Sequence, residues 1–487
     1  QTGRFECSNQ VVNDFQHAIL WGQRGNMWAV PTDCPQRDER LGWTGDAQMF
    51  ANTSCWNLDM NRFYTKWLRD IRDSQGDDGA VRDVNPGGGP AAPAWGDACI
   101  IVPYQTFRHY GDLRILQENW DCMTRWVDYM TSHLTDGLYE RDGYGDWIAV
   151  VGSPKKPISA AYYYYDCVLL SEMAKALGKT ADADKYAQMA AKTRDLFNAR
   201  YLDPATNKYP GGTQTSYALP LFFGLVPEDR QAAVVANLAQ DVLKRGIHLS
   251  TGFLGTGYLN PVLSSNGYHA LAWELAKQTT YPSWGYMVKQ GATTVWELWN
   301  SDKAGPGMNS RNHFCLGAVG EWYYESLAGI GPEQPGFQTL RIAPQPVGDL
   351  TWVKASLDCP YGTVVSNWKL EGGDLLLDIT IPANTSALVT VPTFGRSDVA
   401  ISEGTTKVVQ GGRSIATVAG LTLLSADANG VTFRALGGSY QLKATGVGTP
   451  PPPAFAVPKP PKPLSELHDD FSGLSIDPAR WEILDQG

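Results

Sequence analysis

Two patterns of apolar and polar residues divide this chain. From about residue 9 to 330, apolar residues recur at the spacing of amphipathic helices, and Gly- and Pro-rich loops separate the segments. Within residues 182–192, for example, Tyr186, Met189 and Ala190 fall on one helical face. The pattern predicts helices at Asn9–Gly22, Ala47–Asp73, Gln117–His133, Ala160–Leu177, Thr180–Arg200, Pro227–Arg245, Tyr268–Gln278 and Gly317–Ala328.

Near residue 335 the pattern changes to short alternating or β-branched runs with Gly, Asn or Pro between them. We therefore predict an α domain followed by a β domain: a ring of helix pairs over residues 1–335 and an antiparallel β-sandwich over 336–446. The predicted strands are Leu340–Pro344, Thr351–Leu357, Thr363–Leu370, Asp374–Ile381, Ser386–Val391, Lys407–Val409, Ser414–Val418, Gly430–Ala435 and Ser439–Lys443.

The C-terminal residues have a different composition. Residues 447–463 are rich in Pro and predict a stiff linker that does not join a packed core. Residues 464–487 include Asp469-Asp470-Phe471 and a Trp at 481, and they resemble the opening strand of a concanavalin/laminin-G-like domain. This segment is too short to fold alone, so we expect the truncated start of such a domain or a tail.

Composition narrows the class of partner. The formal net charge of −10 disfavours nucleic acid or an anionic membrane surface as the main partner, and no apolar run has the length of a membrane span. The 17 Trp and 22 Tyr favour carbohydrate, because flat aromatic rings stack on the C–H faces of sugars.

The eight Cys show no metal-ligand spacing, and buried free thiols are the expectation, although an exported protein would have room for one or two disulfides. Residue 1 is not Met and no signal peptide follows, so we expect a trimmed or processed start and a secreted or periplasmic protein.

The segment 31–46, PTDCPQRDERLGWTGD, concentrates the chemistry. Its acids crowd around two arginines and lie beside an indole, as expected of a site that protonates a leaving oxygen while it binds sugar hydroxyls. A buried Arg–carboxylate network that merely fixes a loop is the alternative. The candidate residues here are Asp33, Arg37, Asp38, Glu39, Trp43 and Asp46.

Hydrolysis of a glycosidic bond requires a second carboxyl group, roughly 5–5.5 Å away for retention or 6.5–9.5 Å for inversion. Glu297 is the candidate, because it lies between Trp296 and Trp299; the alternative is a helix-start Glu that satisfies backbone donors. Further candidates for sugar binding pair an acid with a Trp or add an imidazole: Trp95, Asp97, Asp146, Trp147 and His313.

These segments resemble, in order, the landmarks of glycoside hydrolase family 78, the inverting α-L-rhamnosidases. The matching runs are 30–48, 66–70, 95–98, 145–147, 251–256, 292–299 and 312–322, with 355–362 and 381–385 in the β region. The resemblance covers about residues 5 to 445 and implies an (α/α)6 barrel followed by a β-sandwich. Family members usually carry β-sandwich modules before the barrel, and this chain has none.

The resemblance also implies roles. Glu39 would be the general acid, kept protonated by the crowded acids and Trp43, and Glu297 the general base of an exo-acting enzyme that releases terminal α-L-rhamnose. We choose Glu39 over the adjacent Asp38 because of its spacing to Trp43 and Asp46. No cofactor is implied, and a structural calcium ion is left open. The implied −1 pocket is lined by Asp33, Trp43, Asp46, Trp95, Trp147 and His313, with Asp97 contributing electrostatic stabilisation.

Two other classes remain as alternatives. Polysaccharide lyases and unsaturated glucuronyl hydrolases share the toroid, and Tyr162–Tyr165 could suit a lyase, although no His lies beside this run. A non-catalytic carbohydrate-binding protein is the other alternative. The sequence does not indicate the aglycone or the oligomeric state.

Overall fold

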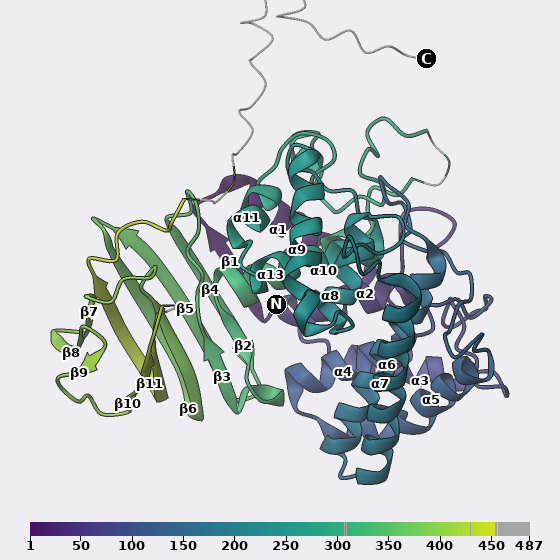
Figure 1. Cartoon of the computed structure of the whole chain (residues 1–487), viewed down its shortest axis with the longest axis horizontal. Coiled ribbons are helices and arrows are strands. Elements are labelled where there is room, and N and C mark those ends of the chain that lie inside the picture. The colour runs from purple at the N-terminus through teal and green to yellow at the C-terminus, as the bar shows by residue number, and fades with distance from the viewer. Residues whose placement is uncertain (306, 308, 429, 453–454, 456–487) are drawn as a thin grey trace, which may run out of the picture. The chain divides into compact units, whose positions relative to one another are not determined.

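The computed structural model describes residues 1–305, 307, 309–428, 430–452 and 455 of the chain, and residues 1–452 form one compact unit (Figure 1). The first part of this unit is helical. Its helices are α1 (Gln10–Asn26), α2 (Thr44–Asn57), α3 (Asn61–Ser74), α4 (Ala98–Tyr110), α5 (Leu113–Ser132), α6 (Lys155–Ala176), α7 (Thr180–Tyr201), α8 (Gln214–Phe223), α9 (Glu228–Lys244), α10 (Phe253–Ser265), α11 (His269–Ala276), α12 (Trp284–Lys289), η1 (Cys315–Val319), α13 (Gly320–Trp322) and η2 (Tyr323–Leu327).

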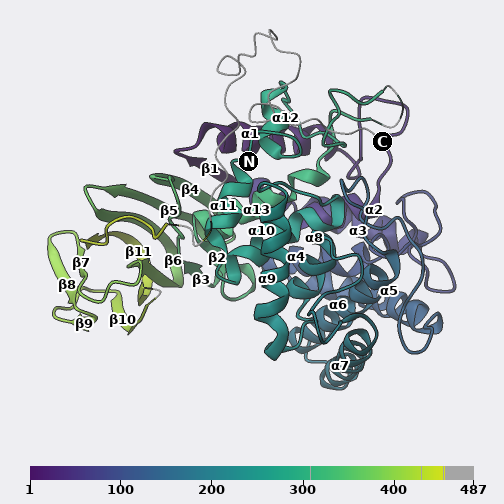
Figure 2. The same ribbon diagram turned by 45° about the horizontal axis from the view of Figure 1, so that its top comes forward.

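The helices form an inner and an outer layer. The inner helices α2, α4, α6, α8, α10 and η1 contact one another in this order, and η1 contacts α2, which closes the ring. Figure 2 shows the helices gathered beside the strands. Every residue of α2 is buried. The outer helix α3 instead buries only Tyr64, Trp67, Leu68 and Ile71, one stripe at helical spacing. The predicted helical toroid is therefore confirmed.

One predicted helix is wrong. The segment Ala47–Asp73 is two helices, α2 and α3, because the chain turns at Leu58. Leu58 is extended and its N–H donates to the carbonyl of Ser54, which ends α2. The chain then reverses, so that α3 packs outside the ring.

The β domain follows the helices. Its strands are β2 (Ile330–Pro332), β3 (Thr339–Ile342), β4 (Trp352–Cys359), β5 (Gly362–Glu371), β6 (Asp374–Pro392), β7 (Ala400–Glu403), β8 (Thr406–Gln410), β9 (Arg413–Ser414), β10 (Leu421–Ala426) and β11 (Gly430–Thr445), with the 3-10 turn η3 (Pro335–Phe337) between β2 and β3. The fold class, helices and then an antiparallel β domain, is confirmed; the one parallel pair among the described strands is β3 with β6.

The long strands β6 and β11 were each predicted as two. They run continuously and pair with each other along their length, with a register shift between Leu436 and Gly438. The first half of β6 pairs with β5 and the second half with β3, so β6 belongs to both halves of the sheet. All strands of the described residues are consequently joined in one hydrogen-bonded network.

The chain starts in the β domain. Strand β1 (Gly3–Cys7), which sequence reasoning missed, pairs antiparallel with β4 before α1 begins. The indole N–H of Trp368 also donates to the carbonyl of Leu327, at the end of the helical part, at 2.8 Å. These contacts fix the helical ring on the β sheet.

The remaining predictions have mixed outcomes. All eight Cys are free in the structure. Of the predicted linker, 453–454 and 456–463 lie outside the described residues, as does the predicted tail 464–487. None of the helices described here is long and apolar enough to cross a membrane.

Candidate active site

The predicted motifs meet in one pocket at the end of the ring where several inner helices begin. Trp43 directly precedes α2, Trp95 lies just before α4, and Phe253 is the first residue of α10. The cavity has a volume of about 240 Å³. Its lining residues are Asp33, Arg37, Glu39, Trp43, Asp46, Trp95, Tyr144, Trp147, Phe253, Glu297 and His313.

The loop between α1 and α2 carries the first group of these residues. Asp33 fixes this loop, because its carboxylate accepts from the backbone N–H of Leu41 at 2.9 Å and its own N–H donates to the carbonyl of Leu41 at 3.0 Å. Burial, together with the charge of Asp46, raises the pKa of Asp33 to about 6. Asp33 is thus an acid that keeps its proton under mildly acidic conditions.

Glu39 is held by two donors in the pocket. Arg37 Nη2 lies 2.6 Å from Oε2, and the indole N–H of Trp43 donates to Oε1 at 3.0 Å. Burial alone would raise the pKa of Glu39, but the hydrogen bonds and the charge of Arg37 outweigh it, and the pKa is lowered. The expectation that crowding keeps Glu39 protonated is therefore wrong, since the nearest charge is the cation of Arg37.

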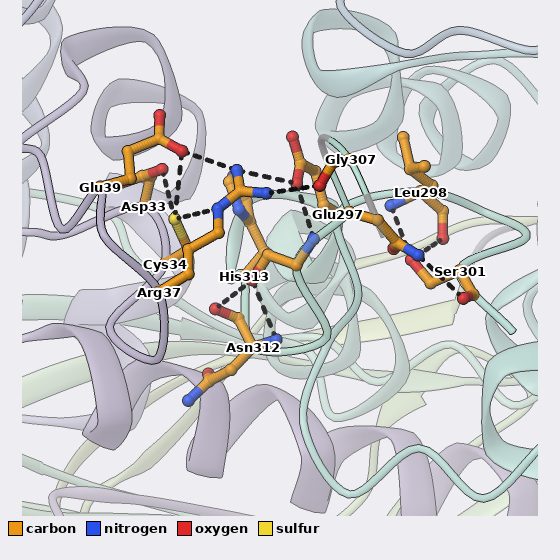
Figure 3. A network of polar contacts seen from close by, with 12 residues as sticks. Asp33, Cys34, Arg37, Glu39, Glu297, Leu298, Ser301, Gly307, Asn312 and His313 are labelled. Carbon is orange, nitrogen blue, oxygen red and sulfur yellow. Dashed lines mark hydrogen bonds and ion pairs between the residues drawn. The ribbon is translucent and has the colours of Figure 1, made fainter. Parts of the chain in front are cut away.

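Glu297 reaches the same pocket from the loop between α12 and η1. Its backbone N–H donates to the carbonyl of Ser310 at 2.8 Å, and its carboxylate accepts from the N–H of Ser310 at 2.8 Å. Arg37 Nη2 lies 3.5 Å from Glu297 Oε2 (Figure 3). One guanidinium nitrogen therefore stands between the carboxylates of Glu39 and Glu297.

His313 and Asp46, two residues that line the pocket, form an ion pair. The His313 Nε2 to Asp46 Oδ1 distance is 2.5 Å, and both side chains are buried. Burial opposes the charged imidazole, but the hydrogen bond and charge of Asp46 prevail and raise the pKa of His313. Because Asp46 lies in the first turn of α2, the helix dipole also favours its negative charge.

An aromatic wall covers one side of the pocket. Tyr144 is its centre, with ring centroids 5.8 Å from Trp43, 4.7 Å from Trp95 and 6.0 Å from Trp147. The Tyr144 hydroxyl donates to Asp83 at 2.9 Å, which fixes the ring. Sequence reasoning missed Tyr144 and Phe253 as lining residues, although both lie inside the motifs around Trp147 and residues 251–256.

Five predicted site residues do not line the pocket. Asp38 is exposed and pairs with Arg40 at 3.1 Å. Asp97 is buried behind the pocket, where it accepts from the N–H of Ala94 at 2.6 Å. The others serve packing and helix capping: Asp146, Trp296 and Trp299.

Asp146 shows why these residues were misplaced. Its buried carboxylate accepts from the backbone N–H groups of Gly252 and Leu254, both at 2.8 Å, and from the hydroxyl of Thr215. Asp146 therefore connects the start of α10 to α8, and both of its oxygens already accept hydrogen bonds from the protein. Trp299 likewise donates its indole N–H to the carbonyl of Thr251 at 2.8 Å.

One cluster in the described residues has the composition of a metal site. Ligand atoms of Asp33, Cys34 and Glu39 lie within 4.8 Å of one another. Arg37, however, already donates to the sulfur of Cys34 and to Glu39, so its guanidinium group takes the position that a metal ion would need. The cluster is better described as part of a hydrogen-bond network.

The chain is similar to known proteins in sequence and fold. Residues 1–327 match the family described as bacterial alpha-L-rhamnosidase 6 hairpin glycosidase domain, and residues 329–406 match the bacterial alpha-L-rhamnosidase C-terminal domain. An alpha-L-rhamnosidase of Streptomyces avermitilis is 40% identical over 400 residues, and one of Formosa agariphila is 38% identical over 409. The matches cover 80% and 81% of this chain but only 38% and 44% of those relatives, so the chain spans less than half their length.

Solved structures agree in fold. The crystal structure of the Streptomyces avermitilis alpha-L-rhamnosidase complexed with L-rhamnose superposes with a TM-score of 0.84 at 36% identity, covering 91% of this chain and 42% of that one. The alpha-L-rhamnosidase from Dictyoglumus thermophilum gives a TM-score of 0.85 at 36% identity, covering 91% and 50%.

Proposed function

The chain belongs to the bacterial α-L-rhamnosidase family, and on that premise we propose that it hydrolyses terminal α-L-rhamnosides with Glu39 as general acid and Glu297 as general base. The observation that carries the proposal is that these two carboxylates line one pocket without contacting each other. The rhamnose-bound relative supports the class of sugar.

The proposed reaction is a single displacement. Glu39 gives its proton to the departing glycosidic oxygen, while Glu297 takes a proton from a water that attacks the anomeric carbon from the other face. Arg37 Nη2 lies between the two carboxylates, at 2.6 Å from Glu39 Oε2 and 3.5 Å from Glu297 Oε2, so the guanidinium must move aside for a water to reach Glu297. Asp33 and Asp46 would stabilise the positive charge that develops on the ring.

Protonation of Glu39 in the complex follows from its partners. Burial raises the pKa of Asp33 to about 6, whereas the hydrogen bonds to Glu39 and the charge of Arg37 lower the pKa of Glu39. A sugar that enters between Arg37 and Glu39 would weaken their ion pair and exclude water, and both changes raise the pKa of Glu39. The acid is thus proposed to gain its proton when substrate binds.

The size of the pocket supports exo action. A cavity of about 240 Å³ is smaller than the roughly 300–1,000 Å³ of sites for drug-sized ligands, so it suits one sugar ring. The wall of Tyr144, Trp43, Trp95 and Trp147 supplies apolar faces for the C–H groups and the methyl group of that ring. The lyase alternative has no comparable support, because Tyr162–Tyr165 are buried in α6 and do not line the pocket.

The test is product analysis with the full chain. L-Rhamnose should be released from an aryl α-L-rhamnoside, and NMR should show the β-anomer first if the reaction inverts. Absence of release, while a characterised rhamnosidase acts on the same substrate, would refute the function; the α-anomer first would refute only the stereochemistry. The proposed reaction needs no cofactor, and unchanged activity in EDTA would exclude a required calcium ion. Export from the cytoplasm is also proposed, and fractionation of the native host tests it.

A further inference from the structure

Cys34 lies at the centre of the acidic loop and has no assigned role. Its side chain is fully buried, directly after Asp33 and beside Arg37 and Glu39 (Figure 3). The sulfur lies 2.8 Å from Asp33 Oδ2 and 3.4 Å from Glu39 Oε2, and Arg37 Nε donates to it at 3.1 Å. One thiol thus contacts three charged groups of the proposed site.

The contacts fit a neutral thiol that both donates and accepts. A thiol has one proton, and the nearer acceptor is the Asp33 carboxylate, while the sulfur lone pairs accept from Arg37. Burial and the neighbouring Asp33 raise the pKa of Cys34, which keeps it neutral. The group therefore acts as a fixed hydrogen-bonding link and not as a nucleophile.

The hydrogen bond from Arg37 Nε to the Cys34 sulfur restricts the orientation of the Arg37 guanidinium. Its Nε is held by Cys34, while Nη2 contacts Glu39 and Glu297. With Nε released, the half-buried guanidinium could turn about its long side chain and leave one or both carboxylates. The planar fork of Arg makes this orientation sensitive to a single partner.

We propose that Cys34 is a positioning residue that orients Arg37 between the two carboxylates and thereby sets the pH range in which Glu39 carries its proton. This inference rests on the proposed function and extends it to a residue that touches no substrate. The alternative is that Cys34 only fills space, as most buried thiols do.

The charged groups around Cys34 determine the direction in which the carboxyl pKa values should shift when the thiol is removed. The charged or titratable groups around the thiol are Arg37, Glu39 and Asp33 from its own loop, Asp46 from α2, and Glu297 and His313 from the loop that precedes η1. The thiol and Arg37 both stabilise ionised carboxylates. Their loss should therefore raise the pKa of the proton-donating pair.

The experiment compares pH profiles of kcat/KM for the full chain and four variants. Cys34→Ala should lower kcat/KM about tenfold and move the alkaline limb up by about half a pH unit, as expected for one lost hydrogen bond. Cys34→Val, which fills the space without hydrogen bonds, should show the same shift. Cys34→Ser, which keeps a donor and an acceptor, should restore the wild-type profile. Cys167→Ala removes another fully buried thiol, on α6, and should leave the profile unchanged.

Two results would overturn the inference. If Cys34→Val keeps the wild-type profile, the thiol only fills space; if Cys34→Ala and Cys34→Ser shift equally, hydrogen bonding is not its role. If Cys34→Ala fails to fold, the comparison of the Val and Ser variants still decides. An inactive wild-type chain refutes the proposed function itself, which is a separate outcome.

Discussion

Asp38 and Glu39 are consecutive in the chain, yet their carboxylates lie in different environments. The Asp38 side chain is fully exposed and pairs with Arg40, whereas the Glu39 side chain is 28% exposed and contacts Arg37 and Trp43 in the pocket. The backbone is tightly turned here: the N–H of Glu39 donates to the carbonyl of Arg37 at 2.8 Å, and Arg40, the next residue, has a φ of 53°, in the left-handed region. Two adjacent acids with one local sequence context are thus separated by backbone geometry.

This difference gives the first prediction. Glu39→Gln should lower kcat by roughly 10²–10⁴, because the proton donor is lost, and Glu297→Gln should do the same through loss of the base. Asp38→Asn is the matched control and should retain nearly full activity. The measurement is steady-state hydrolysis of an aryl α-L-rhamnoside; near-normal kcat in Glu39→Gln together with an inactive Asp38→Asn would reverse the assignment.

The inner helices show where sequence patterns are informative about the fold and where they are not. Outer helices such as α3 and α5 face water on one side, so their apolar stripes predicted helical structure. Inner helices such as α8 and α10 are buried on most sides and lack a polar face, and the sequence pattern did not indicate them. Strand β1 was missed because its partner, β4, lies far away in the sequence.

For the candidate site too, the sequence predicted some residues and misassigned others. All the candidates of the loop 31–46 except Asp38 line one pocket, because acids, arginines and an indole recur there within a few positions. The Gly-Asp and Asp-Trp motifs around Asp97 and Asp146 were ambiguous, since an Asp beside a Trp serves equally well to satisfy backbone N–H groups. Only the positions of Ala94 and Leu254 reveal that use.

Gly45→Ala should damage the aromatic wall. A Cβ on Gly45 would lie 2.3 Å from Cε2 of Trp95, far inside van der Waals contact, so Trp95 or the start of α2 must move. We expect KM to rise about tenfold. Gly88→Ala is the control, because a Cβ there meets nothing within 4 Å. An unchanged KM in Gly45→Ala would show that Trp95 is not part of the sugar-binding surface.

Asp146→Asn should reduce stability more than it alters substrate binding. Because Gly252 and Leu254 donate to different oxygens, an amide N–H₂ in place of either oxygen would face one of these backbone donors, and buried mismatches of this kind cost about 2–4 kcal/mol. The thermal midpoint should therefore fall by several degrees, while exposed Asp142→Asn should leave it unchanged. A raised KM with an unchanged midpoint would instead place Asp146 on the substrate.

The His313–Asp46 ion pair predicts a pH dependence of stability. The pKa of His313 is raised in the folded state, so its contribution is complete below the unfolded value of about 6.5 and is lost as pH rises through the folded value. We expect the difference in thermal midpoint between wild type and His313→Gln to be largest near pH 6 and to shrink in alkaline buffer. A difference that grows with pH would have the wrong sign.

The pH dependence of stability that arises from Asp166, on α6, should also differ between wild type and variant, but here the variant should gain relative to wild type as the pH rises. Both of its carboxyl oxygens are buried, and its polar neighbours are the carboxyl group of Asp97 and the indole N–H of Trp126. Burial and the charge of Asp97 raise its pKa well above the usual value. A raised carboxyl pKa means that the folded protein holds a proton more tightly than the unfolded chain, so this residue costs stability as pH rises above the unfolded value of about 3.9. Asp166→Asn resembles the neutral acid and can donate to Asp97, which itself accepts from Ala94.

The variant should consequently be more stable than wild type at pH 8 and close to wild type near pH 4. Unfolding in urea at both pH values measures this difference. Asp97→Asn is the contrasting variant: the Asp97 carboxylate accepts from the N–H of Ala94 and the indole of Trp126 through different oxygens, and an amide keeps only one acceptor oxygen, so this variant should be less stable at both values. Equal destabilisation by the two substitutions would mean that Asp166 is ionised in the folded protein and that its charge is compensated.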